Sequence, residues 1–297
     1  MAITTLQQIT HYYDQYRDRE LTFTKDIIKT LALDPRQVYV KCNGTQWPCI
    51  INSTSFMHAK IIIGTKTEAF AEFAKKTVSP INLRFCFIES DGQPNSFMVP
   101  CKVGQIGTYM NSTDLAIVTL NFTQRPSDAL IEHTGRLLEA NDNSIRRRDE
   151  SIVINDDTKR RLKLSTEKIS VNIQNVPRNS VLRELSFGGA KIVLMGLAQF
   201  LTHKGVTLTL DFDEPQETLT VKGIITSAEP VEGRKDIVTA TIDFSDEDIP
   251  LEYKLHINEF ITSVHNRQMN NVEQKELLRR QMEARAKLSA AQANLTK

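Results

Sequence analysis

Two stretches of the sequence, Val206–Phe212 (VTLTLDF) and Ile237–Phe244 (IVTATIDF), alternate apolar and polar residues. Alternation with a period of two places the apolar side chains on one face of a β-strand. Four more strand-like stretches lie nearby and are separated by turn residues: Lys168–Ile173, Ser180–Ser186, Ala190–Leu194 and Thr218–Ser227. Six short strands followed by one helix, from Pro250 to about Gln268, predict a small β-barrel with a closing helix.

The first half of the chain is also rich in strand-like runs, which are Val38–Val40, Cys49–Ile51, Ala59–Ile63, Ile81–Ile88, Ser96–Gly104 and Leu115–Phe122. Helical spacing of apolar residues predicts three helices, over Thr4–Leu21, Thr67–Lys76 and Ser127–Leu138. The predicted fold class is therefore mainly β with flanking helices (α+β), built as two small β-barrel domains in tandem.

A polar segment separates the two halves. Glu139–Ser144 has no hydrophobic period and predicts a linker, and Arg146–Arg148 follow directly. We therefore divide the chain into an N-terminal domain (1–140), an arginine-bearing linker (141–151), a barrel domain (152–269) and a charged helical tail (270–297). The tail carries a net charge of +3 and a heptad-like seam, so it is either a solvated helix or one that docks: Leu277, Gln281, Ala284, Leu288, Ala291 and Leu295.

Composition places the chain among soluble globular proteins. Its 297 residues include 37 basic and 36 acidic side chains, and 40% are hydrophobic. The sequence has no apolar run of the roughly 18 residues that a membrane-spanning helix needs and no signal-peptide core, so we expect a cytoplasmic protein without membrane insertion. The four cysteines form no CxxC pair and predict buried free thiols: Cys42, Cys49, Cys86 and Cys101.

Motifs of catalysis are missing from the sequence. The six histidines are scattered without an HExxH spacing, and there is no G-x-S-x-G elbow and no Walker loop. An acidic cluster, Asp243 with Asp246–Asp248, lacks the order of a calcium loop and is more typical of a helix start. We therefore expect a protein that is not an enzyme and that uses no metal or redox cofactor.

Two elements stand out as candidates for binding. Arg146, Arg147 and Arg148 offer guanidiniums that can bind phosphate oxygens or the Hoogsteen edge of guanine. In the second element, Glu184 and Ser186 point to the same side of a strand that ends in Gly188-Gly189. Each element also has a structural reading, as a solvated linker and as an ordinary strand that ends in a glycine turn.

Together the two elements resemble the PilZ family, whose signature is RxxxR followed by [D/N]-x-S-x-x-G. Glu184–Gly189 (ELSFGG) matches the second motif with Glu at its first position, and in the RxxxR register Arg147 is followed by Ser151 in place of arginine. The first half is similar to PilZN-type domains. Phe122–Ile131 and Trp47–Ser55 resemble the spirochaetal PlzA-type proteins in particular.

The resemblance implies a cytoplasmic receptor for cyclic di-GMP, in which ligand binding rearranges the domains and acts on a protein target of motility, virulence or gene expression. It implies a binding site made of Arg146, Arg147, Arg148, Ser151, Glu184, Ser186, Gly188 and Gly189. Lys191, on the strand beyond the glycines, is expected to lie outside this site. The alternative is a degenerate PilZ protein that has lost the nucleotide and binds a protein or nucleic acid.

Nucleic-acid binding has one further argument in its favour, which is a run of seven basic residues between Arg146 and Lys163. Acidic residues interleave with this run. Residues 141–270 hold 17 basic and 20 acidic side chains, a net charge of −3, whereas strong binders of the phosphate backbone usually have a clearly basic domain.

Overall fold

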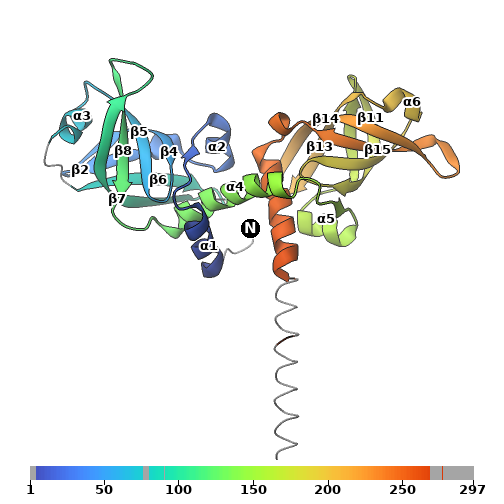
Figure 1. Ribbon diagram of the computed structural model, residues 1–297, viewed down its shortest axis with the longest axis horizontal. Coiled ribbons are helices and arrows are strands. Elements are labelled where there is room, and N and C mark those ends of the chain that lie inside the picture. The colour runs from blue at the N-terminus through green and yellow to red at the C-terminus, as the bar shows by residue number, and fades with distance from the viewer. Residues whose placement is uncertain (1–4, 76–79, 90, 268–275, 277–297) are drawn as a thin grey trace, which may run out of the picture.

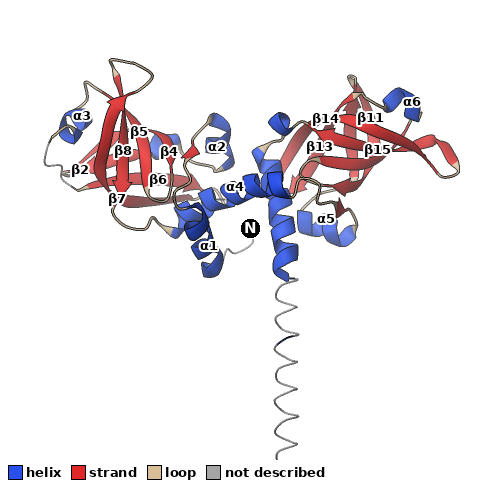
Figure 2. Cartoon of the chain, in the orientation of Figure 1, coloured by secondary structure: helices blue, strands red, loops and turns tan. Residues whose placement is uncertain are grey.

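The structure is a computed structural model that describes residues 5–75, 80–89, 91–267 and 276. The chain forms two lobes, each with its own β-sheet and its own cluster of buried apolar side chains (Figures 1 and 2). The mainly β architecture predicted from the alternating pattern is confirmed. No described helix has the length and apolar character that would let it cross a membrane.

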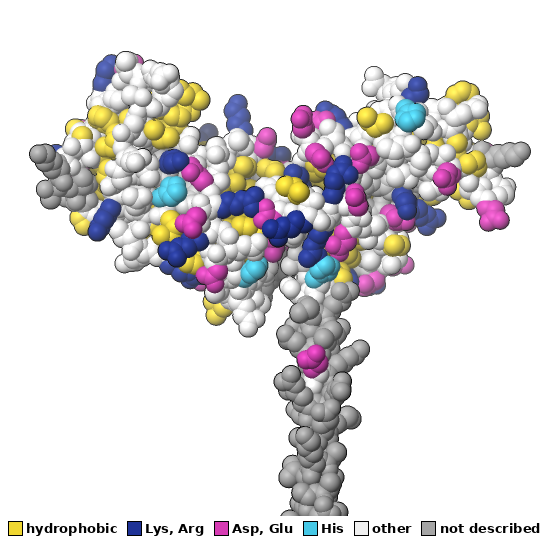
Figure 3. Space-filling model, in the orientation of Figure 1, with side chains coloured by type: hydrophobic (Ala, Val, Ile, Leu, Met, Phe, Trp, Pro, Cys, Tyr) yellow, Lys and Arg dark blue, Asp and Glu magenta, His cyan; other side chains and the backbone are white. Residues whose placement is uncertain are grey.

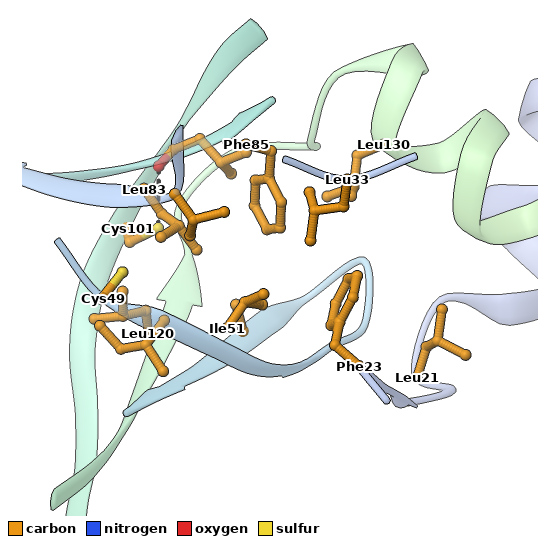
Figure 4. Close-up of a cluster of buried hydrophobic side chains, with 14 of the residues drawn as sticks. Leu21, Phe23, Leu33, Cys49, Ile51, Leu83, Phe85, Cys101, Leu120 and Leu130 are labelled. Carbon is orange, nitrogen blue, oxygen red and sulfur yellow. Dashed lines mark hydrogen bonds between the residues drawn. The ribbon is translucent and has the colours of Figure 1, made fainter. Parts of the chain in front are cut away.

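The N-terminal lobe is an eight-stranded antiparallel sheet with the order β1-β4-β5-β8-β7-β6-β2-β3. Its strands are β1 (Leu21–Thr22), β2 (Tyr39–Cys42), β3 (Thr45–Pro48), β4 (Ile50–Thr54), β5 (His58–Gly64), β6 (Ile81–Ile88), β7 (Pro94–Thr108) and β8 (Leu115–Phe122). Alternate residues are buried along β8 and along the first part of β6, and the predicted bounds of both strands are confirmed. Figure 4 shows part of this core, in which Leu83, Phe85 and Leu120 converge on Ile51.

Helices surround this sheet: α1 (Leu6–Tyr16), α2 (Lys25–Thr30), the 3-10 turn η1 (Pro35–Gln37), α3 (Glu68–Phe73) and α4 (Asp128–Arg146). A hydroxyl accepts a backbone N–H at the N-terminus of each α-helix, supplied by Thr5, Thr24, Thr67 and Ser127. Helices α1 and α4 pack against each other, and the Tyr12 hydroxyl donates to Glu139 Oε2 over 3.2 Å. Burial raises the pKa of Tyr12 well above its usual value.

The C-terminal lobe is a closed barrel of six strands in the order β10-β13-β14-β15-β12-β11, with β10 pairing back to β11. These strands are β10 (Lys168–Ile173), β11 (Val176–Leu185), β12 (Gly189–Met195), β13 (Gly205–Asp213), β14 (Gln216–Val231) and β15 (Arg234–Phe244). The short strand β9 (Ile152–Val153) adds to the edge of β11. Three short helical segments complete the lobe: α5 (Asp156–Leu162), α6 (Ala198–Leu201) and η2 (Asp246–Asp248). The predicted six-stranded barrel is thus confirmed.

A helix over residues 251–267 closes the barrel and also contacts the other lobe. Tyr253, Ile257 and Phe260 belong to the core of the barrel. Leu251 and Leu255 pack against the core of the N-terminal lobe. Within each of these two sets the residues are three or four positions apart, so each set lies on one face of the helix. One face is buried in the barrel and the other faces the N-terminal lobe, so the helix belongs to both.

The linker predicted at Glu139–Ser144 is not irregular, because α4 continues through Arg146. The polar residues of this stretch bind the helix 251–267. Asn143 Nδ2 donates to Asn258 Oδ1 over 2.7 Å, and Asn258 Nδ2 donates to Glu139 Oε2 over 2.9 Å. Helical packing through polar side chains leaves no hydrophobic period to detect in the sequence.

The domain limits at 140 and 151 stay a prediction. The tail predicted for 270–297 lies outside the described residues, apart from Glu276.

Candidate functional site

A hollow of about 370 Å³ lies on the barrel beside the turn that joins β11 to β12. Its volume is in the range of small-molecule sites. Hydroxyl, carboxylate and backbone groups surround it, and its lining comprises Asp149, Ser151, Glu184, Leu185, Ser186, Gly188, Gly189, Ala190, Lys191, Thr226, Thr241, Ile242 and Asp243. Five of the eight predicted site residues are therefore brought together here.

Glu184 occupies the centre of the polar contacts in this hollow. It lies on β11 between Val153 of β9 and Lys191 of β12, directly after an irregularity in the strand register. The Ser151 hydroxyl donates to its Oε2 over 2.7 Å, and Lys191 Nζ donates to its Oε1 over 3.1 Å. The hydrogen bond from Ser151, together with the ammonium of Lys191, lowers the pKa of the Glu184 carboxyl, so the group is an anion at neutral pH.

The two glycines allow a tight turn against the neighbouring strand. Ser186 closes the turn, because both its amide and its hydroxyl donate to the Gly189 carbonyl, over 2.9 and 3.2 Å. A Cβ on Gly189 would collide with the backbone carbonyl of Ile242, and one on Gly188 would lie 2.6 Å from the Arg148 side chain. A side chain is thus excluded at Gly189 by rigid backbone and at Gly188 by a movable arginine.

Arg148 borders the hollow and is held there by acidic residues. Its Nη1 lies 3.0 Å from Asp243 and its Nε 3.2 Å from Asp246, while its carbonyl accepts the Gly188 amide over 2.9 Å. The hydrogen bond to Asp243 raises the pKa of Arg148 further. The acidic cluster and the arginine triplet, which seemed separate in the sequence, therefore form one contact.

Arg147 points away from the hollow. Its Nη1 donates to Nδ1 of His265 on the helix 251–267 and lies 3.5 Å from Glu150. Glu150 in turn pairs with His265 Nε2 over 2.9 Å. Arg146, at the end of α4, is exposed. Of the three predicted arginines, only Arg148 lies beside the other site residues.

Eight residues of the hollow were not among the predicted ones: Asp149, Leu185, Ala190, Lys191, Thr226, Thr241, Ile242 and Asp243. Lys191, which we expected to lie outside the site, lines the same hollow as the predicted residues. Lys191 follows Gly189 by two positions, so both face the same side of β12, and this spacing was a signal present in the sequence. Thr226 and Thr241 come from β14 and β15, and their approach depends on barrel closure.

Basic and acidic side chains are interspersed over the face of the molecule drawn in Figure 3. The basic run from Lys159 to Lys163 is largely neutralised by neighbours. Lys159 pairs with Glu167 over 2.9 Å and Lys163 pairs with Glu259 over 3.2 Å. Arg161 stacks over the Phe260 ring at 4.8 Å, so this run anchors α5 to the helix 251–267.

The arrangement suits a polar ligand with hydrogen-bond donors and negative charge. Glu184 can accept donors such as the N–H groups of a purine edge, four hydroxyls can bind oxygen or nitrogen atoms, and Lys191 can approach an anion. The described lining therefore favours binding.

Comparison with known proteins gives matches over both lobes. Residues 7–141 match the PilZN3 domain family. Over 266 residues the chain is 42% identical to a protein of Treponema denticola named cyclic di-GMP binding protein, and the match covers 89% of this chain and 84% of that protein.

Among solved structures, PlzA of Borreliella burgdorferi in complex with c-di-GMP is 20% identical, with a TM-score of 0.38, over 86% of this chain and 98% of that one. Escherichia coli YcgR in complex with c-di-GMP is 14% identical, with a TM-score of 0.28, over 89% and 99%.

The Treponema denticola match has to include most of both lobes, because it spans 89% of the chain. The PilZN3 match accounts for the N-terminal lobe. The six-stranded barrel and its Glu184–Gly189 motif account for the C-terminal lobe. The chain therefore belongs to the PilZ-domain proteins that carry an N-terminal PilZN3 domain.

Proposed function

We propose that this protein is a non-catalytic receptor that binds cyclic di-GMP in the hollow beside the β11–β12 turn. The observation that carries the proposal is the convergence of Ser151, Glu184, Ser186 and the two glycines on one hollow of about 370 Å³. The Treponema denticola relative, which is named for binding cyclic di-GMP, supports the same ligand.

The residues have distinct roles in this proposal. Glu184 accepts the N–H groups of a guanine edge, because its carboxylate is ionised and a third exposed. Ser186 and the Gly188-Gly189 turn let the ligand approach the backbone closely. Arg147 moves from His265 to the nucleotide, where a guanidinium can form paired hydrogen bonds with phosphate or guanine.

This movement of Arg147 would couple the ligand to the contact between the lobes. In the free protein Arg147 and Glu150 hold His265, which lies on the helix shared by the two cores. The same helix contacts the β11–β12 turn beside the hollow, since the Tyr253 hydroxyl donates to the Ser186 carbonyl. A ligand shifts an equilibrium only through its different affinity for two states, and taking Arg147 from His265 supplies such a difference.

Binding of nucleic acid by the basic run is a weaker candidate. The ion pairs of Lys159 and Lys163 and the stacking of Arg161 leave less free positive charge than the sequence suggests. If the protein does not bind nucleic acid itself, it would act on motility or gene expression through a protein partner that recognises the rearranged lobes.

Calorimetric titration of the full chain with cyclic di-GMP tests the proposal, with cyclic di-AMP and GTP as controls. We expect saturable binding of cyclic di-GMP and much weaker binding of both controls. Hydrogen exchange over residues 141–155 should also slow with ligand. A folded protein that does not bind cyclic di-GMP would instead be a degenerate PilZ protein, and unchanged exchange despite binding would remove the coupling.

A further inference from the structure

Lys191 is the only basic residue among those that line the hollow. Its Nζ lies 3.0 Å from Glu184 Oε2 and 3.1 Å from Oε1, and its side chain is 45% exposed. Three acidic residues line the same space, namely Asp149, Glu184 and Asp243. Arg148 pairs with two of these three carboxylates, over 3.4 Å to Asp149 and 3.0 Å to Asp243. An anionic ligand therefore meets one ammonium that is still partly available.

Lys191 and Ser151 approach Glu184 from two different strand neighbours. Ser151 precedes β9, which pairs with one edge of β11, and Lys191 lies on β12, which pairs with the other edge. Both side chains donate to the same carboxylate, over 2.7 and 3.1 Å. The two side chains therefore lie on either side of the same carboxylate, although 40 residues separate them in the sequence.

A hydroxyl at position 151 provides no positive charge, whereas an arginine there would place a guanidinium beside Glu184. We infer that Lys191 supplies this charge from the opposite edge of β11 and binds a phosphate oxygen of the nucleotide. An ammonium has three donors, so it can keep one hydrogen bond to Glu184 while another meets the ligand. A lysine also binds phosphate as a point charge on a flexible stem, which tolerates the different origin of the side chain.

This inference rests on the proposed function, and it makes a reciprocal prediction. If Lys191 and position 151 share one role, then a cation at either position is sufficient. Lys191→Ala should weaken cyclic di-GMP binding at least tenfold, and Ser151→Arg in the same chain should restore most of the lost affinity. Ser151→Arg alone should tighten binding less than it does in the Lys191→Ala background.

The N-terminal lobe offers a matched control. Lys60 Nζ lies 2.8 Å from Glu20 Oε2, and its side chain is 34% exposed, so Lys60→Ala removes a similar ion pair away from the hollow. Affinity should change less than twofold in this variant. Lys191→Gln is a second test, because it keeps a donor for Glu184 without the charge, and Lys191→Arg should stay within threefold of the natural protein.

Dissociation constants from calorimetry, with thermal unfolding as the check of folding, decide the matter. Equal affinity of Lys191→Gln and the natural chain would overturn the inference while the proposed function stands. Failure of Ser151→Arg to restore affinity in a folded Lys191→Ala protein would overturn the shared role. No binding by the natural chain would instead overturn the proposed function, since the inference concerns only how a bound nucleotide is held.

Discussion

The two lobes contain the same small group of side chains in different surroundings. In the N-terminal lobe, Glu20 accepts hydrogen bonds from the Ser53 hydroxyl and from Lys60. In the barrel, Glu184 accepts from Ser151 and Lys191. The two carboxylate side chains are about equally exposed, at 32% and 30%. The nearby hydroxyl and ammonium lower the pKa of both, although partial burial opposes the shift.

The surroundings differ in backbone and in neighbouring charge. Glu20 precedes β1 and ties it to β4 and β5, with His58 3.6 Å away. Glu184 adjoins a turn of two glycines and a lined hollow. A serine, a glutamate and a lysine in contact therefore do not define a binding site. The close backbone turn and the open space beside it make the difference, and the following variants test this comparison.

The largest contrast is expected between Glu184→Ala and Glu20→Ala. Loss of a charge-assisted hydrogen bond costs roughly 1.5–3 kcal/mol, or about 10- to 150-fold in affinity. Glu184→Ala should weaken cyclic di-GMP binding by such a factor, whereas Glu20→Ala should leave it within twofold. Calorimetric titration measures both. A similar loss in the two variants would mean that the group acts on binding only through stability.

A second variant alters the glycine turn beside Glu184 and keeps the side chains of Ser151, Glu184 and Lys191. Gly189→Ala places a Cβ against the Ile242 carbonyl of β15, so the strands have to separate. We expect the free energy of unfolding to fall by about 1–3 kcal/mol, as overpacking usually costs. Gly205→Ala is the control, because its Cβ meets no atom within 4 Å. Equal stability of the two variants in urea titration would contradict the tight turn.

The third variant concerns Arg147, which contacts His265 on the helix 251–267. His265→Ala removes the partner of Arg147, so less free energy is lost when Arg147 turns to the nucleotide. One hydrogen bond is worth about 0.5–1.5 kcal/mol, so binding should tighten by roughly 2- to 12-fold. Arg147→Ala should weaken it. Unchanged affinity in both variants would show that Arg147 stays at the helix in the bound state.

The smallest expected effect is the pH dependence of stability. Because their pKa values lie below the ordinary 4.5 in the folded state, Glu20 and Glu184 stabilise the protein fully above that value. This contribution is lost as the pH falls from about 4.5 through the lower folded pKa. Each should be worth less than about 1 kcal/mol, since the pairs are partly solvated.

Chemical denaturation between pH 3 and 6 measures this loss, and Glu20→Gln and Glu184→Gln should each flatten the decline. If neither variant changes the slope of the free energy of unfolding against pH, the acid sensitivity arises elsewhere in the chain.

The barrel and the site strand were predictable because their signals are local. Alternation gave β13 and β15, and the motif Glu184–Gly189 placed the turn correctly. The polar end of α4 was not predictable, since its side chains face another helix rather than an apolar core. The capped helix α5 was missed for a similar reason, because its basic residues were interpreted as part of a run that could bind nucleic acid.

The features of the candidate site that the sequence did not predict are mainly contacts between distant segments. The pairing of Arg148 with Asp243 and of Arg147 with His265 joins residues about a hundred positions apart. A single sequence carries no signal for such pairs. Lys191 is different, because its position two residues after Gly189 could be read from the sequence. Only its pairing with Glu184 across the strands could not be predicted.

The helix 251–267 restricts how this chain could exchange parts with its relatives. A barrel that replaced the present one would bring its own closing helix, and the outer face of that helix would need apolar residues at the places of Leu251 and Leu255. It would also need a partner for Asn143 where Asn258 now stands. The two lobes are therefore not interchangeable modules, and substitutions on either side of this helix should be inherited together.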